Sequence, residues 1–259
     1  MQTTLNHLMF GIYPYIALAV FAVGSLIRFD TGQYGWRSKS SQLLRRRQLI
    51  WGSVLFHVGV IGVLCGHAVG LLTPIALFDA IGISHGFKQM MAIVVGGAFG
   101  SACFVGLTML VHRRLFDPRI RATSSFSDIA VLLLLWAQLT LGLLTIPFSL
   151  GHLDGHEMVK FMNWAQGIVT FRGDASATIA DVAPVFKLHI ALGLTLFLIF
   201  PFTRLVHIWS VPLGYLGRNY QIVRTKRRVP LYDPAVEIPA YAPRQRAGSA
   251  AVPPVHQAA

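Results

Sequence analysis

The feature that most constrains this chain is the length of its uncharged segments. Leu49–Phe78 contains no Lys, Arg, Asp or Glu, whereas the ~30 Å hydrocarbon layer of a bilayer requires only about 20 consecutive apolar residues. With 54% hydrophobic and 12% charged residues among 259, the composition is far too apolar for a soluble domain of this size. The sequence therefore predicts a polytopic, all-α integral membrane protein.

Five apolar runs are expected to span the membrane as a helical bundle. They are Phe10–Ile27, a run from Leu49 to about Gly70, Gln89–Val111, Ser127–Ile146 with Pro147 as its end, and Pro184–Trp209. The first is expected to be retained, because neither a basic leader nor a small-residue cleavage site accompanies it. A long polar loop is predicted from Pro147 to Val182. We expect residues 1–228 to form one membrane domain and 229–259, rich in Pro and Ala, to form a disordered cytoplasmic tail.

The distribution of charge predicts the orientation of these spans. Although the formal net charge is +12, the basic residues fall in short blocks between uncharged runs, which is typical of membrane loops and argues against nucleic-acid binding. Assigning residues 28–47, 112–121 and the tail from Arg204 to one side gathers 18 of the 22 Lys and Arg there. By the positive-inside rule, the N-terminus is expected outside and the C-terminus in the cytoplasm.

Four histidines lie within the second and fifth spans. His57 and His67 are 10 residues apart, and His189 and His207 are 18 residues apart. Antiparallel packing of the two spans puts His57 level with His207 near the inner face, and His67 level with His189 near the outer face. A single intramembrane histidine can simply bond a neighbouring carbonyl, but level-matched pairs favour metal ligation by neutral imidazole between facing helices. We therefore predict two stacked bis-histidine haems b.

The unequal spacing of these histidines sets a geometric condition. Regular helices separate the ligands by about 15 Å on the second span and about 27 Å on the fifth. The two spans therefore cannot be straight and parallel, and tilt with a kink at Pro201 is expected to reduce the difference. Covalent c-type haem is excluded because the chain has no CxxCH motif. A bis-histidine haem has no free coordination site and so carries electrons.

Several separated motifs resemble those of a known family. In chain order they are IYPYIA (Ile12–Ala17), FHVGVIGVLCGH (Phe56–His67), RRLFDPRIRAT (Arg113–Thr123), LGLLTIPFS (Leu141–Ser149), WAQGIVTF (Trp164–Phe171) and FPFTRLVHIWSVP (Phe200–Pro212). This set resembles the cytochrome b (gamma) subunit of bacterial membrane-bound respiratory nitrate reductase, from about Ile12 to Arg228. Residues around Ile75–Phe87 diverge from the family pattern, and the tail lies beyond it.

The resemblance implies a source and a sink for electrons. Members of this family oxidise membrane quinol near the outer face and pass electrons through a distal and then a proximal haem b. A cytoplasmic iron–sulfur beta subunit receives them, and a molybdenum alpha subunit reduces nitrate to nitrite. By position, the resemblance implies His67 and His189 as distal ligands, and His57 and His207 as proximal ligands. The chain is then the quinol-oxidising subunit of a quinol:nitrate oxidoreductase in the bacterial inner membrane.

Three further residues are candidates for these sites. Lys88 aligns with the quinol-site lysine of the family, although an interfacial lysine that snorkels to the membrane surface is the competing interpretation. Gly66 lies next to His67, where a quinol ring can approach the haem. Arg204 precedes His207 by one turn and is a candidate partner for a haem propionate.

Two other functions remain open from the sequence. A related quinol-oxidising cytochrome b that feeds another cytoplasmic redox partner has the same ligand pattern. A proton channel or transporter with a histidine relay belongs to a different class, and it predicts polar residues between the histidines. The apolar character of Ile190–Pro201 argues against that relay.

Overall fold

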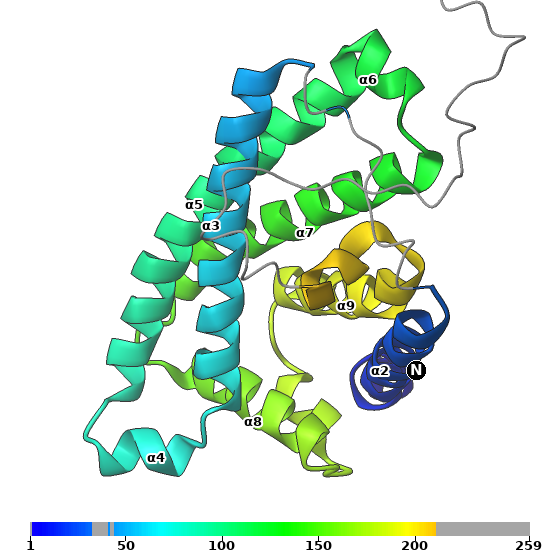
Figure 1. Ribbon diagram of the computed structural model, residues 1–259. Helices are drawn as coiled ribbons and strands as arrows, with labels where there is room; N and C mark the ends of the chain where they lie inside the picture. Colours follow the sequence, from blue (N-terminus) through cyan, green and yellow to red (C-terminus); the bar gives the residue numbers. More distant parts are fainter. Residues whose placement is uncertain (1, 33–40, 42–43, 211–259) are drawn as a thin grey trace, which may run out of the picture. The chain divides into compact units, whose positions relative to one another are not determined.

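The computed structural model describes residues 2–32, 41 and 44–210, and the regular elements in these ranges are all helices (Figure 1). The chain divides into two units, Met1–Val211 and Pro212–Ala259. The second unit contains the predicted tail 229–259, which lies outside the described residues. The expected orientation of the two termini remains a prediction.

Within the described ranges, five helices are long and apolar enough to cross a membrane, as the sequence predicts. They are Thr4–Gly32, Arg46–Leu72, His85–Phe116, Phe126–Leu150 and Pro184–Phe202. The first span combines α1 (Gln2–His7), a π-helical turn η1 (Leu8–Ile12) and α2 (Tyr13–Gly32). The next three spans are the single helices α3 (Arg46–Leu72), α5 (His85–Phe116) and α7 (Phe126–Leu150). The last span consists of α9 (Pro184–Ile199) and the 3-10 turn η4 (Phe200–Phe202). Short helices α4 (Ile75–Ala80) and α6 (Pro118–Ala122) join α3 to α5 and α5 to α7.

The prediction that Pro147 ends the fourth span is wrong. Helix α7 begins at a capping box, in which Ser125 and Asp128 each satisfy the other's backbone N–H, and it continues through Pro147 to Leu150. A proline removes one backbone hydrogen bond. Because Pro147 lies only three residues before the C-terminal end of α7, the helix completes its last turn without a further break.

The fifth span, predicted as Pro184–Trp209 with a kink at Pro201, is divided into separate helical segments. Helix α9 ends at Ile199, η4 contains Pro201, and Thr203 is extended with ψ 178°. A second 3-10 segment, η5 (Arg204–Ser210), then carries His207. The break lies where the sequence predicts a kink, because proline cannot donate to the preceding turn.

The predicted polar loop from Pro147 to Val182 is largely ordered into α8 (His156–Val169) and the 3-10 helix η3 (Ala175–Ile179). Together with the ends of two spans it builds a buried apolar cluster, formed by Phe10, Trp164, Ala165, Ile168, Ala175, Ile179, Val182 and Phe186. The Trp164 indole N–H donates to the carbonyl of Phe10 at 2.9 Å. This segment therefore anchors the beginning of the first span.

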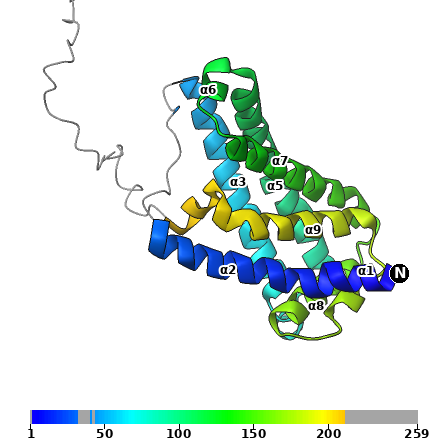
Figure 2. The ribbon, with the colours of Figure 1, turned by 90° about the vertical axis from the view of Figure 1, so that its right-hand side faces the viewer.

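Glycines set the closest contact in the bundle, between α3 and α5. A Cβ on Gly59 would lie 2.5 Å from the Cys103 backbone nitrogen, and a Cβ on Gly106 would collide with the backbone of Phe56. Small residues at such contacts let membrane helices approach through their backbones. On the other side of the bundle, α2 lies along α9 (Figure 2), and the Tyr13 hydroxyl is 2.9 Å from that of Thr195.

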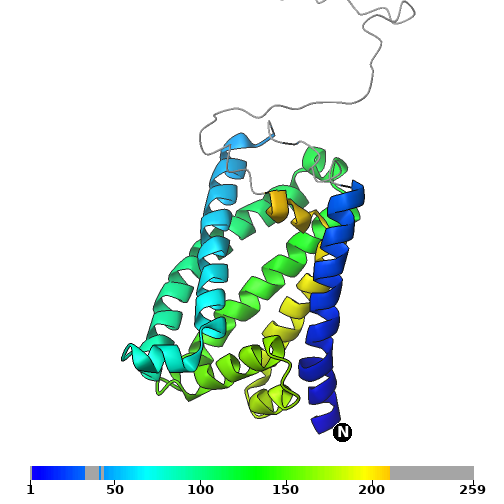
Figure 3. The same ribbon diagram turned by 60° about the horizontal axis from the view of Figure 1, so that its bottom comes forward.

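The two ends of the bundle differ in composition. The end of α2, the beginning of α3 and α6 lie at one end, and α4, α8 and the N-terminus lie at the other (Figure 3). The first end is held by basic residues: the Arg113 guanidinium donates to the carbonyls of Ser41 and Leu44, and Arg45 pairs with Asp117 at 3.0 Å.

Candidate cofactor-binding site

The fold brings the four membrane histidines together as two pairs. The ring centroids of His57 on α3 and His207 on η5 are 6.4 Å apart, and those of His67 on α3 and His189 on α9 are 6.2 Å apart. These are the pairs that the sequence predicts. Their role as haem ligands remains a prediction.

Both separations match two imidazoles on one metal ion. An imidazole nitrogen lies about 2.0–2.1 Å from a bound first-row metal, and its ring centre about 1 Å further, which puts the two centroids about 6 Å apart. The described residues contain no group of three or more His, Cys, Asp or Glu that could hold a metal. Each pair could therefore offer two protein ligands, a number that fits a metal whose remaining positions belong to a flat macrocycle such as haem.

Hydrogen bonds fix the same tautomer in all four rings. The Nδ1 atoms of His57, His67, His189 and His207 lie 2.7, 2.8, 3.2 and 2.7 Å from the carbonyl oxygens of Ser53, Val63, Gln138 and Arg204, respectively. A carbonyl oxygen only accepts, so each Nδ1 carries a proton, and in the neutral form of such a ring Nε2 is the nitrogen whose lone pair can bind a metal. Metal-bound histidines typically donate their other N–H in this way.

The acceptor of His189 differs from the other three. His57, His67 and His207 donate to carbonyls of their own segments, three or four residues earlier, whereas His189 donates across to α7. The close approach depends on Gly142, where a Cβ would lie 2.9 Å from Cε1 of His189. Sequence reasoning missed both Gln138 and Gly142, because the link between α7 and α9 is tertiary.

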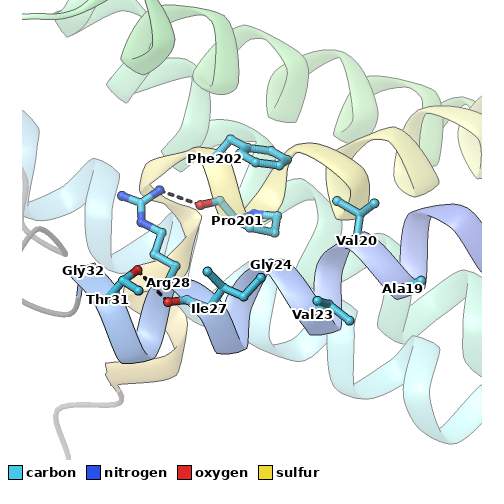
Figure 4. A pocket seen from close by; sticks show the side chains of 10 residues that line it. All are labelled: Ala19, Val20, Val23, Gly24, Ile27, Arg28, Thr31, Gly32, Pro201 and Phe202. Atoms are coloured by element: carbon cyan, nitrogen blue, oxygen red, sulfur yellow. Dashed lines mark hydrogen bonds between the residues drawn. The ribbon is translucent and has the colours of Figure 1, made fainter.

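Arg28 on α2 fixes the break that leads to His207. Its guanidinium donates to the carbonyl of Pro201 at 2.5 Å (Figure 4) and to the carbonyl of Thr203 at 3.4 Å. Carbonyls at a helix end lack intrahelical donors, so Arg28 satisfies groups that the proline break exposes. It also borders a groove of about 800 Å³ between α2 and η4. Sequence reasoning counted Arg28 only as a loop charge, although its place at the end of the first span pointed to a helix-end partner.

Lys88 lies inside the protein. It is only 9% exposed, and its ammonium lies 4.5 Å from the centre of the Phe78 ring and 4.0 Å from the sulfur of Met162. Among the described residues it has no carboxylate partner. This contact is a cation–π interaction, and the burial argues against a lysine that snorkels to the surface. The backbone at Gly66 faces open space, since an added Cβ would have no heavy atom within 4 Å.

Arg204, the expected propionate partner, is engaged with a carboxylate. Its guanidinium lies 3.4 Å from Asp128, the acidic residue of the α7 capping box. Arg114 on α5 donates to the Ser124 hydroxyl at 2.8 Å. Both arginines therefore reach the beginning of α7, and contact with a propionate remains a prediction.

At the opposite end, Lys160 on α8 binds two carboxylates. Its ammonium lies 2.8 Å from Asp181 and 2.9 Å from Glu157. The hydrogen bond that Lys160 donates to Asp181 is the main cause of a raised Lys160 pKa, followed by the one that it donates to Glu157. The bond from Lys160 also lowers the pKa of Asp181. Glu157 is thus held in a structural ion pair, which does not favour a proton relay through it.

Comparison with known proteins identifies the family of this chain. The family described as nitrate reductase gamma subunit matches residues 6–226. The respiratory nitrate reductase 1 and 2 gamma chains of Escherichia coli (strain K12) are 53% and 50% identical, each over 86% of this chain and 98% of the relative. The nitrate reductase gamma chain of Bacillus subtilis (strain 168) is 41% identical over 85% of this chain and 99% of the relative. The chain therefore belongs to the nitrate reductase gamma subunit family.

Proposed function

We propose that this chain is a dihaem cytochrome b that takes electrons from membrane quinol near the outer face and passes them inward to the other subunits of a respiratory nitrate reductase. Family membership and the five apolar helices make it a multi-pass protein of the inner membrane and part of an oxidoreductase complex. The path of the electrons, the two haems b and the oxidation of quinol are the proposal.

The observation that carries the proposal is the state of the four histidines. Two pairs of rings lie 6.2 and 6.4 Å apart, and in each ring the Nδ1 proton is held by a carbonyl. A histidine whose only role was to pack between two helices would not need a second histidine ring at this distance. His67 and His189 would hold the outer (distal) haem, and His57 and His207 the inner (proximal) haem.

When bound, each haem supplies reversible one-electron transfer without an open coordination site. The protein's own residues fix where this happens. The helix α3 carries one ligand of each pair, so it sets the separation of the two sites along the membrane. The apolar segment Ile190–Pro201 disfavours water and protons along the path, so electrons and protons are separated.

Lys88 and Gly66 are the proposed quinol site. A buried ammonium donates hydrogen bonds and stabilises negative charge on a quinol oxygen as its proton leaves. Lys88 fits this role because it is buried against Phe78 and Met162 and pairs with no carboxylate in the part of the chain that the structure describes. Gly66 leaves space beside His67 for a flat ring. Release of the protons on the outer side while electrons cross inward would generate a membrane potential.

The electrons then require a partner on the inner side. The end of the bundle near His207 carries Arg45, Arg113, Arg114 and Arg204. We propose that the iron–sulfur beta subunit docks at this basic end and passes electrons to the molybdenum alpha subunit, which reduces nitrate to nitrite.

The test is a reduced-minus-oxidised spectrum of the purified chain with haem quantified, repeated for His57→Ala, His67→Ala, His189→Ala and His207→Ala. We expect two haems b in the wild type, with both members of a pair losing the same haem. His152→Ala is the matched control, because its Nδ1 also meets a carbonyl four residues earlier, at 3.1 Å, in an exposed position. Absence of haem from correctly inserted wild-type protein would refute the proposal and favour the histidine-relay channel.

A further inference from the structure

The contact between α7 and α9 is reciprocal. Gln138 and Gly142 are four residues apart on α7, as are His189 and Gly193 on α9, so each pair shares one helix face. A Cβ on Gly142 would lie 2.9 Å from the His189 ring, and a Cβ on Gly193 would lie 3.1 Å from the Gln138 amide. Each large polar side chain therefore lies over the glycine of the opposite helix.

We infer that Gly142 is a positioning residue, which holds the His189 ring in the orientation and hydrogen-bonding state needed of a haem ligand. This inference rests on the proposed function. The absence of a side chain at Gly142 is what lets Nδ1 of His189 come within 3.2 Å of the Gln138 carbonyl. Any side chain at position 142 occupies the space of the ring edge.

A movement of α7 away from α9 is opposed on its next face, where α7 packs against α5. The absence of a Cβ at Gly100 makes room for Leu143 there, because a Cβ at that position would lie 2.9 Å from Cδ2 of Leu143. The ring of His189 is the movable part, because it turns about its side-chain torsions. An added methyl at position 142 would therefore rotate or displace the ring and lengthen its bond to the carbonyl of Gln138.

This displacement has an electronic consequence. A hydrogen bond from the second ring nitrogen makes a ligating imidazole more basic, which stabilises the ferric state, and second-shell hydrogen bonds are among the factors that set haem potentials. Weakening the bond should therefore raise the midpoint potential of the His67/His189 haem. The His57/His207 haem should be unaffected, since both of its ligands donate to carbonyls of their own segments.

The experiment is a redox titration of both haems in the purified complex, with electron paramagnetic resonance (EPR) spectra of the oxidised protein, for wild type and Gly142→Ala. We expect an upward shift for the His67/His189 haem alone and a changed EPR signal from that haem. Alanine has a higher helix propensity than glycine, so the substitution does not weaken α7 itself. Gly151→Ala is the matched control, because Gly151 follows α7 with an ordinary φ of −74° and has no neighbour closer than 3.4 Å.

Three outcomes would overturn the inference: unchanged potentials and EPR signals in Gly142→Ala, a shift confined to the other haem, or loss of both haems. Loss of only the His67/His189 haem would support it, because the displaced ring would no longer reach the iron. Gly193→Ala adds a methyl to the same helix contact but meets only the movable amide end of Gln138, so it should leave both potentials unchanged. The same shift in Gly193→Ala would contradict a specific role of Gly142. Absence of haem from the wild type would refute the proposed function instead.

Discussion

Substitution of Gly59 by alanine should damage both histidine sites at once. Gly59 lies on α3 between His57 and His67, and its added Cβ would be 2.5, 2.6 and 2.7 Å from the N, Cβ and Cα atoms of Cys103. These atoms belong to the α5 backbone or are fixed to it, so no side-chain rotation relieves the collision. The two helices must separate.

The required movement can be worked from these distances. Ordinary van der Waals contact needs 3.4–4 Å, so α3 and α5 must move apart by about 1 Å, and overpacking of this kind costs about 1–3 kcal/mol. Metal sites tolerate displacements of only about 0.2 Å in ligand distance. Because α3 carries one histidine of each pair, Gly59→Ala should lower the occupancy of both proposed haems, whereas a variant of a single histidine should lower the occupancy of one.

The assay is haem per chain, read from the reduced-minus-oxidised spectrum, with the midpoint of thermal unfolding in detergent as a second measurement. Gly32→Ala is the matched control, because the nearest atom to its added Cβ is 3.9 Å away. Wild-type haem content and an unchanged unfolding midpoint in Gly59→Ala would refute the view that this backbone contact holds the two sites. Loss of one haem alone would also contradict it.

Three other changes test separate parts of the structure. Arg28→Met leaves the carbonyls of Pro201 and Thr203 without their donor, which should cost about 1–3 kcal/mol and alter the EPR signal of the His57/His207 haem alone; an unchanged signal would contradict the positioning role. Lys88→Met should slow quinol-dependent haem reduction at least about tenfold, the equivalent of about 1.4 kcal/mol, while haem content stays constant; full activity would exclude the ammonium from the quinol site. Lys160→Met should lower the unfolding midpoint by an amount that is constant between about pH 5 and 9. The pKa of Asp181 is lowered in the folded protein, so its contribution to stability is fully present above pH 3.8, its ordinary pKa, and is lost as the pH falls through the folded-state pKa. The pKa of Lys160 is raised, so its contribution is fully present below pH 10.5, its ordinary pKa, and is lost as the pH rises through the folded-state pKa. A difference that changes between pH 5 and 9 would contradict the ion pair.

The membrane spans were predictable because hydropathy is a local property. A run such as Leu49–Phe78 needs no knowledge of its neighbours to be identified, and the corresponding helix Arg46–Leu72 agrees with it. The pairing of histidines followed from the same runs together with the distribution of charge. Where a span ends depends on capping and on tertiary contacts, which explains the wrong boundary at Pro147.

Other features lay beyond sequence reasoning because distant segments create them. Helix α8 is short and polar on one side, and its buried face exists only because Trp164 packs on the first span and bonds the carbonyl of Phe10. The roles of Gln138 and Gly142 depend on which helix lies beside α9. Small and polar residues in apolar helices are the available signal, since they commonly mark helix contacts in membranes.

The break in the fifth span follows from the spacing of the histidines. On a regular helix, 10 residues rise about 15 Å and 18 residues rise about 27 Å, so two level pairs cannot form unless the longer segment leaves its axis. In lipid, the backbone groups that such a break exposes must find partners. Thr203 supplies two of them, because its hydroxyl donates to the Phe200 carbonyl at 3.0 Å and accepts from the Leu205 N–H at 3.2 Å. Arg28 supplies the donors for Pro201 and Thr203. The proline, the threonine and an arginine from another span are therefore the residues that let one chain bring both pairs together.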